Sequence, residues 1–452
     1  MSLNPARGLA LDVVTRVRER EAYAHETLDA ALSRRKLNPR DSSYATRLAY
    51  GTIACRGTLD EAVSRFVTGA ALEPGVADAL AISAYEILFT RTPPRAAVSE
   101  GVELVRSVKP RAAGLANAVL RRLAEVAGDF PWGDPDTDVA ALARLHGHPE
   151  WLAELWVTEL GHEAATALMA ANNEPAPLYL AHLPFESAYE AVLDALATDG
   201  AEPKSCPVPG CIQAGVPSVA VKSAALRNHQ VIVADAGAQF TAFLVHPRPS
   251  QTIVELGAGR GTKSLLMAGA AFLDGGVASI SAIDVHSFKL ESLRGIAEQV
   301  KAKGIRTVVA DATDIAAPGM PGAGSADVVL VDAPCSGLGT LRRHPDRRWR
   351  AQPDQIETLA LLGARLLSTA AALVKPGGFV VYSTCTIAQA ENAAVVDAFL
   401  ASEHGEGFTV DLLDTDIPEQ WRRFSTTQGY FQSLPEEGGT DGHFVARLKR
   451  GR

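Results

Sequence analysis

Two cysteines stand directly after apolar runs that are typical of buried strands. Cys335 ends the sequence DAPC (332–335), and Cys385 ends the sequence YSTC (382–385). The carboxyl ends of parallel strands meet at one edge of a sheet, so we expect both thiols in one site. A thiolate is a strong nucleophile, and a second sulfur can act as a base. The pair therefore predicts chemistry in which one sulfur attacks and the other removes a proton.

Methylation of carbon 5 of a cytosine needs this division of labour. That carbon is too weakly nucleophilic to accept a methyl group until a nucleophile has added at carbon 6. A base must then remove the carbon-5 proton so that the nucleophile can leave. A free thiol with a pKa near 8.5 is only ~3% ionised at pH 7, so the site should favour the thiolate through positive charge or hydrogen bonds.

A basic run, RRHPDRRWR, follows the first cysteine at residues 342–350. We expect it to supply positive charge to the thiols and to bind the phosphates of a nucleic acid. A solvated charged loop is the alternative for this run. The phosphate-binding candidates are Arg342, Arg343, Arg347 and Arg348.

A glycine-rich turn follows the predicted strand at residues 252–256. Glycines let a backbone approach a ligand closely, and tight packing is the alternative reason for them. The turn lacks the GxGxxG spacing of dinucleotide sites, which favours S-adenosylmethionine over NAD. The turn consists of Gly257, Ala258, Gly259, Arg260, Gly261, Thr262 and Lys263.

Acidic residues end or follow three later predicted strands, namely Asp284, Asp311 and Asp332. Carboxylates accept hydrogen bonds, so Asp284 suits ribose hydroxyls and Asp311 suits an adenine amino group. Capping of the following helices is the alternative for any one of them. Three acids in register with a glycine turn favour a nucleoside ligand.

The first part of the chain, residues 1–130, is predicted to be an all-helical domain. Apolar residues recur there at helical spacing, with polar or proline breaks between the segments. The expected helices cover residues 7–18, 24–34, 41–56, 59–66, 75–89, 96–108 and 112–127. Residues 128–138, with two prolines and two glycines, predict a linker.

The remainder of the chain predicts two further domains. Residues 140–230 indicate a small α+β domain, with helices at 149–173 and 187–198 and strands at 178–183 and 218–221. Residues 231–452 alternate short β-branched runs with helical segments. That alternation predicts an α/β Rossmann-like domain with a mainly parallel sheet.

The composition limits location and partners. The start of the chain lacks the pattern of a signal peptide, and no uninterrupted apolar run is long enough to span a bilayer, so we expect a cytoplasmic protein without a membrane partner. Five cysteines in 452 residues argue against a disulfide framework. The spacing of CPVPGC (206–211) does not fit a zinc pair, so we expect no metal. The net charge of -9 opposes nucleic-acid binding, but residues 1–130 carry roughly +3.

These motifs resemble the bacterial Sun/RsmB-type 16S rRNA cytosine-5 methyltransferases. The most diagnostic are DAPCSGLGTLRRHPDRRW (332–349) and YSTCTIAQAEN (382–392). VIVADAGAQFTAFLV (231–245) resembles the family's entry strand and helix, and TDGHFVARLKR (440–450) resembles its closing hairpin. In the first domain, the similarity is to the NusB-like RNA-binding domain of this branch, and it rests on YEILF (85–89), AAVSEGVELV (96–105) and GLANAVLRRL (114–123).

The resemblance implies a role for each candidate residue. Cys385 would attack carbon 6 of a cytosine in 16S rRNA to form a covalent adduct, and Cys335 would be the base. Asp332 would hydrogen-bond the cytosine ring. S-adenosylmethionine would bind the turn at residues 257–263 together with the three strand-end acids. The implied partner is unassembled or early-assembly 16S rRNA, bound by a monomer.

Two positions depart from the family's pattern. Where the family usually reads CAAPGGKT, this chain reads GAGRGTKS (257–264), although the lysine and the small residues remain. Ala181 stands where the family's middle domain usually has an arginine. The alternatives are the same chemistry on transfer RNA or another rRNA site, a DNA cytosine methyltransferase, and an RNA-binding assembly factor without catalysis. The second cysteine and the helical domain argue against the DNA enzyme.

Overall fold

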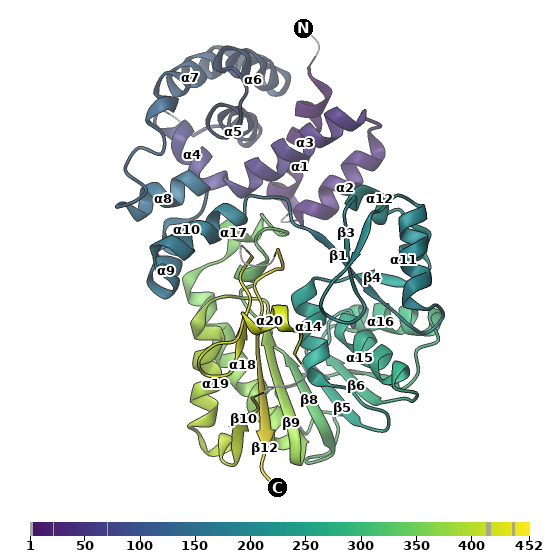
Figure 1. The fold of residues 1–452 in the computed structure, drawn as a ribbon. Coiled ribbons are helices and arrows are strands. Elements are labelled where there is room, and N and C mark those ends of the chain that lie inside the picture. Colours follow the sequence, from purple (N-terminus) through teal and green to yellow (C-terminus); the bar gives the residue numbers. More distant parts are fainter. Residues whose placement is uncertain (1–2, 21, 70, 413–416, 436–438) are drawn as a thin grey trace. The chain divides into compact units, whose positions relative to one another are not determined.

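The computed structural model describes residues 3–20, 22–69, 71–412, 417–435 and 439–452 (Figure 1). Contacts divide the chain into two compact units. The helical unit comprises Met1–Glu174 and Leu341–Gln352, and the sheet unit comprises Pro175–Thr340 and Pro353–Arg452. The chain therefore crosses between the units three times.

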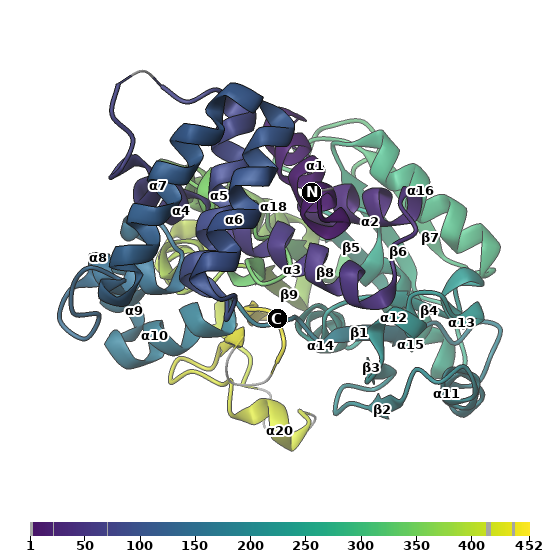
Figure 2. The ribbon, with the colours of Figure 1, turned by 90° about the horizontal axis from the view of Figure 1, so that it is seen from above.

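The helical unit is built around one buried helix, α5 (Pro74–Phe89). Apolar residues occupy almost every face of α5, which is typical of a helix surrounded by others. It packs against α1 (Pro5–Arg20), α3 (Pro39–Ala54), α4 (Arg56–Ser64), α6 (Pro94–Val108) and α7 (Ala113–Val126) (Figure 2). Helix α2 (Ala24–Arg34) packs on α1 and α3. The prediction of an all-helical N-terminal region is confirmed.

Three further helices belong to the helical unit, although we predicted them as part of a middle domain. They are α8 (Val139–His146), α9 (Glu150–Leu160) and α10 (His162–Ala171). The predicted helix at 149–173 is interrupted at Gly161, whose φ of 84° suits glycine and breaks the helical hydrogen bonding. By contacts the helical unit extends to Glu174, and the predicted domain boundary near residue 130 stays a prediction.

The segment Leu341–Gln352 belongs to the helical unit, although the residues before and after it belong to the sheet unit. It contains the short helix α17 (Arg347–Arg350). Arg348 is fully buried there. Its guanidinium donates to Ala54 O at 3.3 Å, Gly147 O at 3.0 Å and Asn172 O at 3.2 Å. These carbonyls end α3, α8 and α10, where backbone acceptors lack partners and the helix dipole is negative.

The buried position of Arg348 corrects one prediction. We expected this arginine to bind RNA phosphate, but its guanidinium is enclosed by helix ends and has no exposed surface. Burial lowers the pKa of Arg348 to about 10. The sequence shows four arginines within seven residues but does not show which of them points inward.

The main sheet of the other unit has the strand order β10-β12-β9-β8-β5-β6-β7, and β11 pairs with β12. The strands are β5 (Thr252–Leu256), β6 (Ser279–Asp284), β7 (Ile305–Val309), β8 (Ala326–Asp332), β9 (Val374–Thr384), β10 (Phe408–Val410), β11 (Phe431–Gln432) and β12 (Phe444–Arg450). From β9 to β7 the pairing is parallel, whereas β12 is antiparallel to β9. The order reverses between β5 and β8, which is where doubly wound sheets bind ligands.

Helices cover both faces of this sheet (Figure 1). One face packs on α14 (Ala236–Val245), α15 (Thr262–Leu273) and α16 (Ser287–Gln299), and the other on α18 (Pro353–Leu373) and α19 (Ala393–Leu400). Helix α18 is long and apolar enough to span a membrane by composition, but it packs on β8 and β9 in the core. Helix α20 (Glu419–Arg422) adds Trp421, which stacks on Phe240. The predicted Rossmann-like fold is confirmed.

A second, four-stranded antiparallel sheet has the order β2-β3-β1-β4. Its strands are β1 (Leu178–His182), β2 (Pro203–Ser205), β3 (Cys211–Ala214) and β4 (Val231–Val233), with α11 (Tyr189–Thr198) and α13 (Ala224–Arg227) beside them. The strand predicted at 218–221 is wrong. This segment contains helix α12 (Pro217–Ala220), because Pro217 occupies the first helical turn, where its missing N–H is not needed.

The role of Arg348 predicts the stability of the helical unit. Arg348→Met should lower the free energy of unfolding by about 3 kcal/mol, because the carbonyls of three helix ends lose a charged donor. Arg348→Lys should recover only part of this loss, since one ammonium cannot reproduce a planar fork of donors. Chemical denaturation followed by circular dichroism measures both effects. Arg347→Met is the matched control, and an equal loss in that variant would contradict the assignment.

Candidate active site

The two predicted cysteines lie together at the carboxyl edge of the main sheet. Strands β8 and β9 pair in parallel, with Asp332 opposite Ser383. Cys335 and Cys385 follow these strand ends, and their sulfurs are 3.4 Å apart. The backbone N–H of Cys385 also donates to the Cys335 sulfur at 3.4 Å. Both side chains are partly exposed, so a substrate can reach them.

The sulfur pair is not symmetric. The pKa of Cys335 lies well above its ordinary value, first because of its hydrogen bond with Cys385 and then because of burial and the charges of Cys385 and Glu391. A proton shared by the pair therefore belongs mainly to Cys335. This leaves the Cys385 sulfur as the better nucleophile.

Glu391 and Asn392 hold the two cysteine loops together, and we did not predict this role. Glu391, in the short 3-10 helix Gln389–Glu391, is buried and accepts from the Ser336 N–H at 2.7 Å and from the Ser336 hydroxyl. Asn392 accepts from the Thr384 hydroxyl at 2.6 Å and donates to Thr386 O at 3.0 Å. One residue thus fixes the Cys335 loop and the next fixes the Cys385 loop. The only sequence signal was the Glu-Asn pair that ends the second motif, YSTCTIAQAEN (382–392).

The glycine turn joins this thiol pair to the predicted cofactor site. Lys263, in the first turn of α15, donates to Asp332 Oδ2 at 2.6 Å, and Ser383 donates to Oδ1 at 3.3 Å. Burial alone would lower the pKa of Lys263, but the charge and hydrogen bond of Asp332, followed by Glu255 and Cys385, leave it raised. Lys263 is therefore a fixed cation that interacts electrostatically with Cys385.

The turn needs glycine at two positions for steric reasons. Gly257 has a φ of 85°, and a Cβ there would lie 2.4 Å from the carbonyl oxygen of Asp332. Gly261 has a φ of 81°, and a Cβ there would lie 2.3 Å from Leu293. Gly259 faces open space, which leaves room for a ligand above the turn. The Ala258 N–H bonds Ile283 O at 2.9 Å and holds the turn against β6.

The structure places the other predicted cofactor residues along the same edge. Asp284 ends β6 and accepts from the Gly259 N–H at 2.9 Å and the His286 N–H at 2.8 Å. Burial would raise the pKa of Asp284, but these hydrogen bonds and the His286 ring lower it. Asp311 follows β7 and is exposed, and its hydrogen bonds from Thr313 lower its pKa. Arg260 is exposed and Thr262 begins α15. The glycine turn at residues 257–263 and the acidic side chains along this edge of the sheet together fit S-adenosylmethionine.

The predicted source of positive charge for the thiols, the basic run, stays a prediction. The basic run belongs to the helical unit, and Arg348 is buried there. Within the sheet unit, Lys263 and His443 are the cations that interact electrostatically with Cys385. Arg342 donates to Glu174 O at 3.1 Å, and Arg342, Arg343 and Arg347 are partly exposed. The RNA contact of these three arginines stays a prediction.

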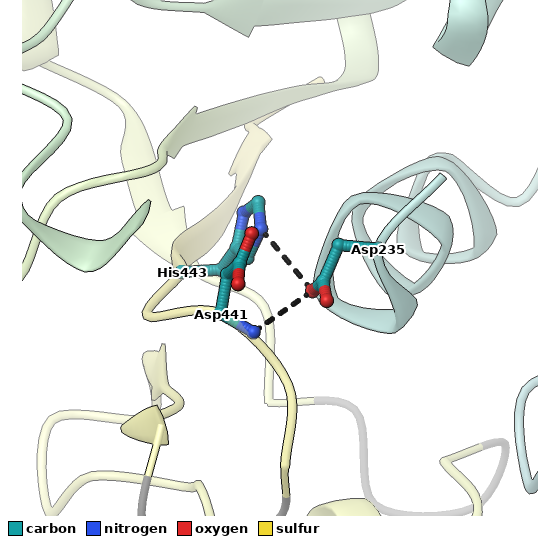
Figure 3. A group of neighbouring side chains, drawn as sticks. All are labelled: Asp235, Asp441 and His443. Atoms are coloured by element: carbon teal, nitrogen blue, oxygen red, sulfur yellow. Dashed lines mark hydrogen bonds and ion pairs between the residues drawn. The ribbon is translucent and has the colours of Figure 1, made fainter. Parts of the chain in front are cut away.

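A second cluster of polar side chains contains Asp235, Asp441 and His443 (Figure 3). Their donor atoms lie within 4.8 Å of one another, and by type they suit a divalent cation. However, Asp235 Oδ1 already accepts from the N–H groups of Gly237 at 2.8 Å and Asp441 at 3.1 Å, and it faces His443. We describe the cluster as a buried ion pair and assign no metal to it.

The fold and the site define a class of protein. A doubly wound sheet with an antiparallel strand β12, a glycine turn after β5 and acids at the neighbouring strand ends are typical of S-adenosylmethionine-dependent methyltransferases. A family model described as 16S rRNA methyltransferase RsmB/F matches residues 242–449, and one described as NusB family matches residues 4–125.

Similarity extends over the full length of curated relatives. Ribosomal RNA small subunit methyltransferase B of Thermus thermophilus is 32% identical, covering 100% of this chain and 99% of that protein. A Bacillus subtilis protein, described as a probable ribosomal RNA small subunit methyltransferase B, is 29% identical with complete coverage of both chains. The crystal structure of PH0851 shares the fold, with a TM-score of 0.81, 24% identity and complete coverage of both chains. The chain therefore belongs to the RsmB/F family of rRNA methyltransferases, and its cofactor is S-adenosylmethionine.

Glu255 gives the site a distinctive pH dependence. The carboxyl group of Glu255 is fully buried and accepts a hydrogen bond from the Ser264 hydroxyl. Burial raises its pKa to about 8 from an ordinary value of 4.5. The folded state therefore keeps the proton while the unfolded chain loses it, and stability falls as the pH rises from 4.5 to about 8.

Glu255→Gln should remove this pH dependence, because glutamine is neutral in both states. As the pH rises through this window, the melting temperature of the native protein should fall relative to that of the variant. Thermal unfolding at a series of pH values checks the expectation. A constant difference across the window would contradict the buried, protonated carboxyl group.

The clamp formed by Glu391 predicts a kinetic effect. Glu391→Ala should lower the rate of methyl transfer to RNA by about 100-fold, because displacement of a reacting group by about 1 Å has effects of this size. The expected loss is in kcat, since Glu391 bonds the cysteine loop and not the cofactor turn. Transfer of radiolabelled methyl groups measures it. Glu403→Gln, an exposed substitution, is the control and should retain native activity.

Proposed function

We propose that this chain methylates carbon 5 of a cytosine in 16S rRNA through a covalent adduct with Cys385. The observation that supports the proposal most directly is the 3.4 Å separation of two thiols beside the cofactor turn. Membership of the RsmB/F family supports ribosomal RNA as the substrate. The chemistry needs a nucleophile and a base on one pyrimidine, and the two sulfurs are close enough to serve the same ring.

The first step is addition of the Cys385 thiolate to carbon 6 of the cytosine. A carbon–sulfur bond forms, the double bond between carbons 5 and 6 is lost, and carbon 5 becomes nucleophilic. The turn of residues 257–263, with Asp284 and Asp311, would hold S-adenosylmethionine, which would supply the methyl group to carbon 5 and leave as S-adenosylhomocysteine. Asp332, oriented by Lys263 and Ser383, hydrogen-bonds the cytosine ring.

The second step is release of the product. Cys335 releases its own proton to solvent and then, as a thiolate, removes the proton from carbon 5, so that the double bond forms again and the Cys385 thiolate leaves. A thiol with a raised pKa is the stronger base once it is ionised, which suits Cys335 to this role. The asymmetry between the sulfurs thus supports their unequal assignment.

The proposal extends to the RNA-binding regions. Residues 1–130, which match the NusB family model up to residue 125, are the proposed helical RNA-binding part. Residues 140–230 are proposed to add contacts with RNA, and Arg342, Arg343 and Arg347 to bind phosphates. A target base has to leave its stack to reach both thiols, so a loop or flexible RNA element is the expected substrate.

The division of roles predicts different behaviour for two cysteine variants. Cys335→Ala should accumulate a covalent complex with methylated RNA, because the adduct forms but cannot eliminate. Cys385→Ala should form none, because it lacks the nucleophile. Denaturing electrophoresis with labelled rRNA and S-adenosylmethionine distinguishes them. An adduct in the Cys385 variant would reverse the roles, and none in either variant would favour an assembly factor without catalysis.

The RNA substrate is tested separately from the chemistry. Bisulfite sequencing of RNA from a deletion strain should show one or more unmethylated cytosines in 16S rRNA. A loss confined to transfer RNA or another rRNA would retain the chemistry and overturn the proposed substrate. Re-expression of the native chain should restore the methylation, whereas the Cys385→Ala variant should not.

A further inference from the structure

His443 belongs to the segment that precedes β12, and its side chain lies beside helix α14 (Figure 3). Its side chain is 9% exposed, and its Nε2 atom is 3.5 Å from Asp235 Oδ1. Gly237 makes room for the ring, because a Cβ there would lie 2.3 Å from the Cδ2 atom of His443. The Asp441 N–H donates to Asp235 Oδ1 at 3.1 Å and ties the two elements together. The imidazole is therefore held in a single position beside a carboxylate.

The pairing of β12 with β9 brings the segment of His443 towards Cys385. Strand β12 runs antiparallel to β9, and the last pair of their register is Phe444 opposite Thr384. Extended by one residue beyond the paired strands, this register would place His443 opposite Cys385. Two hydrogen bonds fix this arrangement, from the Gly442 N–H to Gly339 O at 2.8 Å and from the Gly339 N–H to Cys385 O at 3.1 Å.

The charges around His443 favour its protonated form. Burial by itself would lower the pKa of this imidazole, but the hydrogen bond and charge of Asp235, followed by Cys385 and Asp441, leave it raised. Further charges near Cys385 come from α15 and β8, where Lys263 pairs with Asp332. Glu391 lies on the other side of the sulfur pair and acts on Cys335.

We propose that His443, as an imidazolium held by Asp235 and Asp441, is a positioning residue that stabilises the thiolate of Cys385. The proposal rests on the proposed function only in naming Cys385 as the nucleophile. The direction of the effect follows from the charge balance. Loss of His443 would remove a cation and leave two carboxylates near the sulfur, and both changes disfavour a thiolate. Lys263 cannot compensate, because Asp332 already balances its charge.

The experiment measures the acidity of the Cys385 thiol and not methyl transfer. Full-length protein carrying Cys335→Ala, which leaves a single thiol titration at the site, is alkylated with iodoacetamide across a pH series in the presence of EDTA. Peptide mass spectrometry gives the rate at Cys385 separately from the other cysteines. His443→Gln should raise the apparent pKa of this thiol by about one unit, which is about tenfold less thiolate at pH 7.

Two further variants separate charge from shape. His443→Lys restores a cation and should return the thiol pKa towards that of the parent protein. His404→Gln, which changes an exposed histidine in the 3-10 helix Glu403–Gly405, should have no effect. An unchanged thiol pKa in folded His443→Gln, or an equal increase in His443→Lys, would overturn the proposal.

A reciprocal measurement keeps His443 in place if its variants do not fold. Coupling between two titrating groups is mutual, so Cys385→Ser in the same parent protein should lower the pKa of the His443 imidazole. Nuclear magnetic resonance of labelled histidine follows that titration, and an unchanged value would overturn the proposal. If the thiol results hold while RNA is not methylated at cytosine, the proposed function fails and the electrostatic coupling stands.

Discussion

The active-site edge depends on the parallel pairing of β8 with β9. The pairing runs unbroken from Val328 opposite Phe379 to Asp332 opposite Ser383. A slip of one residue would turn every side chain of one strand to the opposite face and would separate the loops that carry the sulfurs. The register is fixed at the far end by Gly378, where a Cβ would lie 2.6 Å from Asp327 O. The chemistry at one edge of the sheet therefore depends on a steric constraint at the other.

Sequence reasoning located the parts of the site that strand topology alone determines. Both cysteines, the glycine turn and the three acids follow predicted strands, and parallel strands bring their ends to one edge whatever the loops do. Glu391, His443 and Arg348 were not recognised in their observed roles, because each depends on contacts that no local pattern reveals. Arg348 bonds residues far away in sequence, and the antiparallel register of β12 is needed to bring His443 towards Cys385. The extent of the helical unit was not recognised for the same reason, since a single buried guanidinium joins α8 and α10 to α3.

Three buried cations, Arg348, Lys263 and His443, are stabilised by different kinds of partner. Taking an ion out of water costs several kcal/mol unless nearby groups replace the lost hydration. Arg348 receives that replacement from neutral carbonyls at helix ends, Lys263 from the carboxylate of Asp332, and His443 from Asp235 and the neighbouring Asp441. Lys263 and His443 interact electrostatically with Cys385. Arg348 contributes an internal support to the helical unit, while Lys263 and His443 place positive charge beside Cys385 within the sheet unit.

The Cys335 loop is held within the sheet unit by Glu391, which accepts from the Ser336 N–H at 2.7 Å. Only a few residues separate this cysteine from Leu341, where the polypeptide enters the helical unit. That segment is tied down by Asp346, which accepts from the Ala24 N–H, and by the buried Arg348. A segment held by such contacts has already lost much of its conformational entropy during folding and need not lose it when substrate binds. Glu391 therefore orders the Cys335 loop within the sheet unit, while Asp346 and Arg348 order the following segment within the helical unit.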